Sequence, residues 1–300
     1  MKKILIALLV IVMGLAFWYF VIKKNDYRVT FKVKGTPEAV YHHILMYSDW
    51  DNKNNSFVEN SDSLQFKQVK KKIRSQDTTL LVNWKLKKEN DSVTKVIVDI
   101  NSGNYSFANK LKLLQGETVF SKAWVKNISD FQKTINDFNK KIKVRVDGLA
   151  KVPAMQYAYV SGSMDRQEKA KFMMTANVDT YPKIRNFRTK KDGHPFIKVK
   201  SWDIGTDQID LDFGFPLKIS DSVLVEDPVK LGTSEPFNAL KATYYGNYAY
   251  SDQAWFALLD YARTNNIKLK NEVLEIFYDN PMQGGDDTKW KAEIFMPVAE

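Results

Sequence analysis

An internal repeat in the second half of the chain is the feature that most constrains the fold. Residues 154–162 align with residues 239–246, and residues 209–217 align with residues 290–298. The offset falls only from 85 residues (239 − 154) to 81 (297 − 216), so the order of the segments is kept. Repeated units of this kind bury their apolar faces against each other. The repeat therefore predicts a pseudo-twofold domain with a cleft where the two copies meet.

The second copy shows which elements make up one unit. Residues 240–245 have the composition of a strand, and a helix begins at Ser251 and Asp252, whose side chains accept hydrogen bonds from a first helical turn. Apolar residues then recur at helical spacing, and residues 273–278 and 290–296 favour two further strands. Each copy is therefore predicted to be strand, helix, strand, strand.

Glu275 is the unexpected residue of this unit. Because side chains alternate across a strand, Glu275 shares one face with Val273 and Phe277, while the opposite face is also apolar. A buried carboxylate is costly without a partner. Two interpretations stay open: a solvent-facing side chain on a strand whose other face is core, or a charge that faces a cleft.

Three short motifs accompany this glutamate. They are Gly246-x-Tyr248, Glu275-Ile-Phe-x-x-Asn-Pro281 and Glu293-Ile-Phe-x-Pro297-Val298. With these motifs, residues 142–300 resemble the GyrI-like (gyrase-inhibitor-like) domain, the effector-binding domain of AraC- and MerR-type regulators. In that family an acid at this position lies in an aromatic-lined cleft and faces lipophilic, often cationic, ligands.

The resemblance implies a ligand site around Glu275. Aromatic faces hold cations well, and a desolvated carboxylate adds to that attraction. For Trp255 the alternative is a place in the core, because it lies on the apolar face of the predicted helix. The candidate ligand-binding residues are Glu275, Tyr244, Tyr245, Tyr248, Trp255 and Phe277.

The N-terminus predicts a single membrane span. Residues 4–22 carry no charge and are flanked by lysine pairs. A helix of this length spans roughly 28 Å, close to the hydrocarbon thickness. No small-residue cleavage site stands in good position, and the chain has no cysteine that could be lipidated. We expect an uncleaved anchor. The basic residues after the span outnumber those before it, which slightly favours a cytoplasmic location for the rest of the chain. The membrane orientation stays open.

Charge is divided unequally between the halves of the chain. Residues 1–150 carry 26 Lys+Arg against 14 Asp+Glu (+12), whereas residues 151–300 carry 19 against 21 (−2). The basic half follows the predicted span, where its lysines could face anionic lipid or simply water. No helix-turn-helix, zinc or RNA-recognition motif is present, so nucleic acid is not expected as a partner.

Residues 26–141 predict a separate domain. Residues 27–34 alternate as a strand, and Thr36 and Pro37 begin a helix. Several strand-like runs follow. Residues 120–125 form a further short strand or helix start, and an amphipathic helix covers residues 130–141. This order, the opening pattern of residues 27–40 and Trp50 resemble the START-like (SRPBCC, polyketide-cyclase-like) helix-grip fold. The resemblance implies a curved sheet wrapped around a long helix. Residues 51–55 depart from the family pattern, which leaves the cavity of that fold open to question.

The remaining chemistry is limited. The three histidines show no metal-ligand spacing, and no nucleophile elbow, phosphate loop or dinucleotide fingerprint occurs. Neither a metal nor a cofactor is predicted.

The sequence thus predicts an α+β protein with an anchor (1–25), a START-like domain (26–141) and a GyrI-like domain (142–300) of two strand-helix-strand-strand repeats. The expected function is binding of a small lipophilic or cationic ligand by a single-pass membrane protein, in a sensor or sequestering role. Two alternatives stay open. One is hydrolysis of small electrophiles, with Glu275 as general base beside Tyr248. The other is inhibition of a protein partner through the domain surface.

Overall fold

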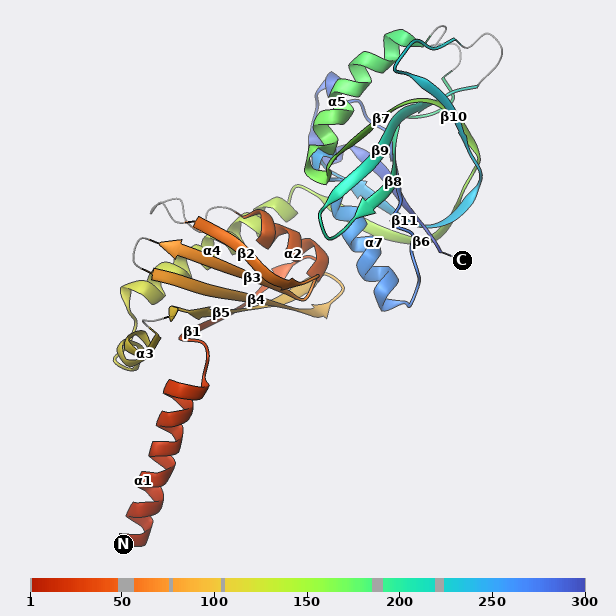
Figure 1. The fold of residues 1–300 in the computed structure, drawn as a ribbon. Helices are drawn as coiled ribbons and strands as arrows, with labels where there is room; N and C mark the ends of the chain where they lie inside the picture. The colour runs from red at the N-terminus through yellow and green to blue at the C-terminus, as the bar shows by residue number, and fades with distance from the viewer. Residues whose placement is uncertain are drawn as a thin grey trace. The chain divides into compact units, whose positions relative to one another are not determined.

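The computed structural model describes residues 2–47, 57–75, 78–103, 106–184, 191–218 and 224–299. The chain divides into two compact units, Met1–Asp137 and Phe138–Glu300. Each unit holds one antiparallel sheet with helices packed on it, so the fold is α+β (Figure 1).

The first unit begins with a long apolar helix. Helix α1 (Lys2–Phe17) continues into the π-helical turn η1 (Trp18–Ile22), and none of its residues is buried. By length and composition this helix could cross a membrane. In Figure 1 it extends away from the rest of the first unit.

A five-stranded sheet forms the body of the first unit, in the order β1-β5-β4-β3-β2. As predicted, Thr36 caps helix α2, its hydroxyl accepting from the Ala39 N–H at 3.4 Å, and Pro37 is the first helical residue. The elements are β1 (Tyr27–Lys34), α2 (Pro37–Met46), β2 (Phe57–Leu64), β3 (Gln68–Ser75), β4 (Thr78–Asn90), β5 (Val93–Asn101), α3 (Ser106–Leu114) and α4 (Val119–Asn139).

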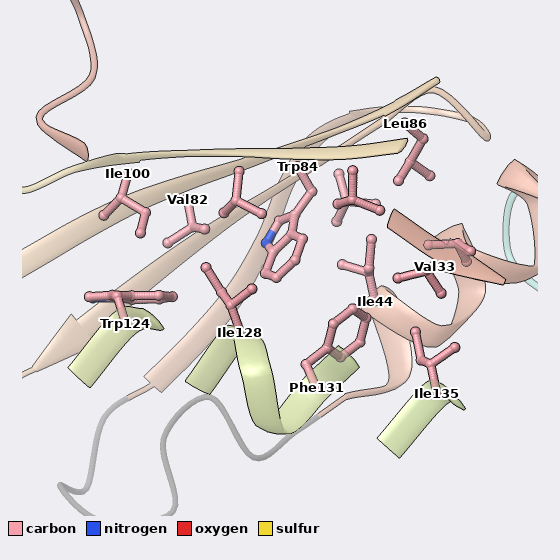
Figure 2. Close-up of a cluster of buried hydrophobic side chains, with 14 of the residues drawn as sticks. Val33, Ile44, Val82, Trp84, Leu86, Ile100, Trp124, Ile128, Phe131 and Ile135 are labelled. Atoms are coloured by element: carbon pink, nitrogen blue, oxygen red, sulfur yellow. The ribbon is translucent and has the colours of Figure 1, made fainter. Parts of the chain in front are cut away.

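Helix α4 covers the apolar face of this sheet, as Figure 2 shows. Trp124, Ile128, Phe131 and Ile135 recur at helical spacing and are all buried. Phe131 meets Trp84 of the sheet with ring centroids 5.4 Å apart. This stripe runs through one continuous helix, so the helix-start alternative for residues 120–125 is confirmed, the strand alternative is wrong, and the predicted start at residue 130 was too late. The START-like resemblance stays a prediction, because its second marker, Trp50, lies outside the described residues.

The second unit contains an eight-stranded sheet in the order β10-β7-β9-β8-β12-β13-β11-β6. Its elements follow the predicted repeat: one copy is β7-α5-β8-β9 and the other is β11-α7-β12-β13. The bounds are β6 (Lys143–Val152), β7 (Met155–Asp165), α5 (Lys169–Thr180), β8 (Phe196–Asp203), β9 (Gln208–Pro216), β10 (Lys230–Ser234), β11 (Phe237–Tyr245), α7 (Gln253–Thr264), β12 (Val273–Phe277) and β13 (Lys291–Pro297).

The strand that precedes each copy pairs with the other copy, which the internal alignment did not reveal. Strand β6 precedes the first copy but pairs with β11 of the second, and β10 precedes the second copy but pairs with β7 of the first. At the centre of the sheet β8 pairs with β12. Read from either end, the strand order places equivalent strands at equivalent positions, as a pseudo-twofold arrangement requires.

Candidate functional site

Glu275 lies at the centre of the second unit. Strand β12 pairs with β8 on one side and with β13 on the other, so Glu275 stands opposite Ile197 and Ile294. The residue is 0% exposed. The solvent-facing interpretation of this glutamate is therefore wrong.

The Glu275 carboxylate accepts three hydrogen bonds. Its Oε1 lies 2.6 Å from Nζ of Lys169 and 2.5 Å from Nε1 of Trp255. Its Oε2 accepts from the hydroxyl of Ser251 at 2.7 Å. A buried carboxylate is tolerated in a fold when donors and an opposite charge surround it in this way.

Lys169 supplies the opposite charge. It begins α5, is 2% exposed, and donates to the Ser251 hydroxyl at 2.7 Å as well as to Glu275. Its Nζ lies 4.8 Å from the centroid of the Trp255 ring, a cation–π distance. Burial lowers the pKa of Lys169 from its usual value, while the Glu275 carboxylate opposes that shift and favours the ammonium form.

A second ion pair joins the two copies beside the first. The guanidinium of Arg166 donates to both oxygens of Asp207 at 2.8 Å and also pairs with Asp252, which precedes α7. Its Cζ lies 5.1 Å from the centroid of the Phe256 ring. Thus Arg166 and Lys169 of the first copy meet Asp252 and Glu275 of the second.

Neither cation was predicted from the sequence, although a signal was present. Arg166 and Lys169 stand just before and at the first turn of α5. The helix dipole disfavours positive charge at that end, so two cations there indicate specific acidic partners.

An apolar cavity of about 190 Å³ opens on the sheet face that α5 covers. It lies between α5 of the first copy and the segment after β12 of the second. Methionine and aromatic side chains dominate its lining, together with Lys191, His194 and Asp279. The main apolar lining residues are Met173, Met174, Phe213, Phe215, Phe277 and Tyr248.

Of the six candidate ligand-binding residues, Tyr248 and Phe277 line this cavity. Tyr244 and Trp255 are instead 0% exposed core residues: the Tyr244 hydroxyl donates to the Asn247 carbonyl at 2.7 Å, and Trp255 packs on Trp202 with centroids 5.1 Å apart. Tyr245 is half-buried at the end of β11. Of the two interpretations of Trp255, the place in the core is therefore confirmed.

Tyr248 fixes one wall of the cavity. Its hydroxyl donates to the Lys291 carbonyl at 2.7 Å and accepts from the Asp279 N–H at 2.9 Å. Its ring packs on Phe277 with centroids 4.7 Å apart. Burial raises the pKa of Tyr248, so the phenol stays protonated at neutral pH.

Basic side chains stand at the side of the cavity where Tyr278 lies. His194 packs on the Tyr278 ring with centroids 4.4 Å apart, and Nζ of Lys291 lies 4.1 Å from the centroid of the same ring. Burial, and then Lys191 and Lys291, lower the pKa of His194. Across the described part of the chain, no group of three histidine or acidic side chains is placed to hold a metal ion.

Comparisons with known proteins found no matching family model and no matching curated protein. Several solved structures are similar to this chain. The EcmrR C-terminal domain is 15% identical and covers 53% of this chain and 98% of its own, with a TM-score of 0.42. SAV2435 bound to tetraphenylphosphonium is 14% identical, with 52% and 94% covered and a TM-score of 0.39. A hydrolase from Listeria innocua is 15% identical, with 56% and 98% covered and a TM-score of 0.33.

Proposed function

We propose that this chain is a membrane-anchored protein of the GyrI-like class that binds a small lipophilic molecule in the cavity of its second unit, in a sensor or sequestering role. The observation that carries the proposal is the cavity itself. It is apolar, it lies between elements of the two copies, and a few polar groups converge on it. Small-molecule sites commonly have this composition.

The size of the cavity limits the ligand. Its volume of about 190 Å³ is below the roughly 300 Å³ at which ligand sites usually begin. Three methionines, Met173, Met174 and Met282, form part of the lining. Methionine side chains are flexible and repack easily, so a ligand can enlarge this space without moving the sheet.

Two observations support the anchor. Helix α1 with η1 is long and apolar enough for a span. Helix α3 is fastened to the end of that span: Lys110 donates to the carbonyls of Phe20 and Lys23, and Phe107 packs on Phe20 with centroids 4.9 Å apart. Phe107, Leu111 and Leu114 form an exposed apolar stripe on α3. An amphipathic helix at the end of a span suits the membrane interface.

Hydrolysis with Glu275 as general base gains no support from these contacts. The carboxylate is 0% exposed and already accepts from Lys169, Trp255 and Ser251. The Tyr248 hydroxyl is engaged by Lys291 and Asp279. A general base must reach the proton that it removes, which here would require water to enter the buried cluster.

The proposed function can be tested with the full-length protein in lipid nanodiscs carrying 13C-methyl methionine. Lipophilic probes, among them tetraphenylphosphonium and neutral triphenylphosphine oxide, are expected to shift the methyl resonances of Met173 and Met282. The methyl of Met46, which is 49% exposed in the first unit, is the internal control. If every probe left Met173 and Met282 unmoved, the cavity would not be the ligand site, and a protein partner would become the better explanation.

A further inference from the structure

We propose that Lys169 is a built-in counter-ion that occupies Glu275, and that the cavity therefore selects neutral or anionic lipophilic ligands over cations. This inference rests on the proposed function, because it names the class of ligand that the same cavity takes. Its starting point is the position of the ion pair relative to the cavity.

The ion pair stands on the same faces of α5 and β12 as two residues that line the cavity. Lys169 and Met173 are four residues apart on α5 and so share one face of the helix. Glu275 and Phe277 are two residues apart on β12 and share one face of the strand. Met173 and Phe277 both line the cavity. The Lys169–Glu275 pair is therefore the buried charge next along both elements from the cavity lining.

Lys169 already makes the contacts that a cationic ligand would need there. Its ammonium lies 2.6 Å from the Glu275 carboxylate and 4.8 Å from the centroid of the Trp255 ring. A ligand cation could gain the same carboxylate only by expelling Lys169. The expelled ammonium would lose a buried ion pair, which is costly when one partner is removed and the other stays.

The chain around Lys169 is held in place. Three residues earlier, Arg166 is 5% exposed and is bound by Asp207 through two hydrogen bonds of 2.8 Å, with Asp252 as a further partner. These contacts fix the turn that leads into α5. Withdrawal of Lys169 by a movement of this turn would therefore break the Arg166 pairs as well.

The charged groups on the cavity wall do not favour a cation. Lys191 and Asp279, one of each sign, line the cavity, and the lowered pKa of His194 keeps its imidazole neutral at neutral pH. The Asp279 carboxylate accepts from the backbone N–H of Lys291 at 2.6 Å. With Glu275 neutralised by Lys169 and Asp279 engaged by the Lys291 backbone, the wall offers a cation no uncommitted carboxylate.

The test uses two probes of the same shape and opposite charge, tetraphenylphosphonium and tetraphenylborate. Full-length wild type and Lys169→Met are compared in nanodiscs at one lipid concentration, so that partition of each probe into lipid is the same for both proteins. Affinities are read from the methyl shifts of Met173 and Met282. Lys171→Met is the matched control, because Lys171 is an exposed lysine on the same helix.

Loss of Lys169 frees the carboxylate. We expect the affinity for tetraphenylphosphonium to rise at least tenfold in Lys169→Met and to stay unchanged in Lys171→Met, while the affinity for tetraphenylborate falls. Equal phosphonium affinity in wild type and Lys169→Met would overturn the inference and leave the proposed function intact. Absence of any shift with either probe, or with triphenylphosphine oxide, would overturn both.

A second variant covers the case in which Lys169→Met does not fold. Lys169→Met/Glu275→Leu replaces the pair by apolar side chains. If the pair is neutralised internally in the wild type, this variant binds tetraphenylphosphonium within about threefold of wild type. A drop of tenfold or more would mean that Glu275 attracts the cation despite Lys169, and the inference would be wrong.

Discussion

The ammonium of Lys169 lies 2.6 Å from the carboxylate of Glu275, in a cluster where both residues are at most 2% exposed. Lys169 begins the helix of the first copy, and Glu275 lies on a strand of the second. The pair thus joins the two copies across the centre of the sheet.

We expect Glu275→Gln to lower the free energy of unfolding of the second unit by about 3–5 kcal/mol, because the Lys169 ammonium would remain buried without its counter-charge. Urea unfolding followed by the fluorescence of Trp202 and Trp255 measures this loss. Lys169→Met/Glu275→Leu should be less destabilised than the sum of its single variants. Additive losses would show that the pair is not coupled.

Tyr248→Phe removes one hydroxyl that bridges two segments. The Lys291 carbonyl and the Asp279 N–H would each lose a partner, and we expect a loss of about 1–2 kcal/mol. Amide hydrogen exchange should accelerate at Asp279. Tyr250→Phe is the matched control, because Tyr250 is 46% exposed. Unchanged exchange at Asp279 would contradict the bridging role.

Lys71 should make the first unit more stable at alkaline pH. It is 3% exposed and donates to the carbonyls of Leu45 and Tyr47 at 3.3 Å, and burial lowers its pKa from 10.5 to about 8. Between these two values the unfolded chain binds more protons than the folded one. The free energy of unfolding should therefore rise with pH from about 8 to 10.5, by about 3 kcal/mol at most.

Denaturant unfolding of the first unit at several pH values measures this slope. Lys71→Met should remove this pH dependence. Lys72→Met, which changes the neighbouring lysine, should keep it. A slope that persists in Lys71→Met would assign the pH dependence to another group.

Helix α3 should lie in the membrane interface if α1 crosses the bilayer. Because the chain has no cysteine, single cysteines at Phe107, Leu111 or Leu114 can each carry one spin label. We expect these labels to be accessible to oxygen and protected from a water-soluble nickel reagent. A label at Lys112, on the polar side of α3, should show the reverse. Equal nickel accessibility at all four sites would place the stripe in water.

Local sequence signals predicted much of the fold. The repeat gave the order of elements in both copies, and the cap at Thr36 begins α2 where expected. Helix boundaries and the pairing of distant strands were harder to predict. The helix over residues 119–139 was predicted in two pieces, a strand or helix start at 120–125 and a helix from 130. The exchanged strands β6 and β10 pair with partners far along the chain. Such pairing is decided by tertiary contacts, which a propensity does not contain.

The site shows the same division. Glu275 was conspicuous because a lone carboxylate in an apolar strand needs a partner. The identity of the partner was hidden, since Lys169 stands 106 residues away in the chain. Tyr244 and Trp255 were candidates for the ligand site through the family resemblance, with the core as the alternative for Trp255, and both are buried in the core.

The two copies of the repeat contribute opposite charges to the buried cluster. Arg166 and Lys169 come from the first copy, and Asp252 and Glu275 come from the second. Each copy of the repeat holds only half of both ion pairs. A chain made of two first copies would bury Lys169 without a carboxylate, although Arg166 would keep Asp207, and a chain made of two second copies would bury Glu275 without Lys169. The two copies are therefore not interchangeable, and each needs the other to neutralise its buried charge.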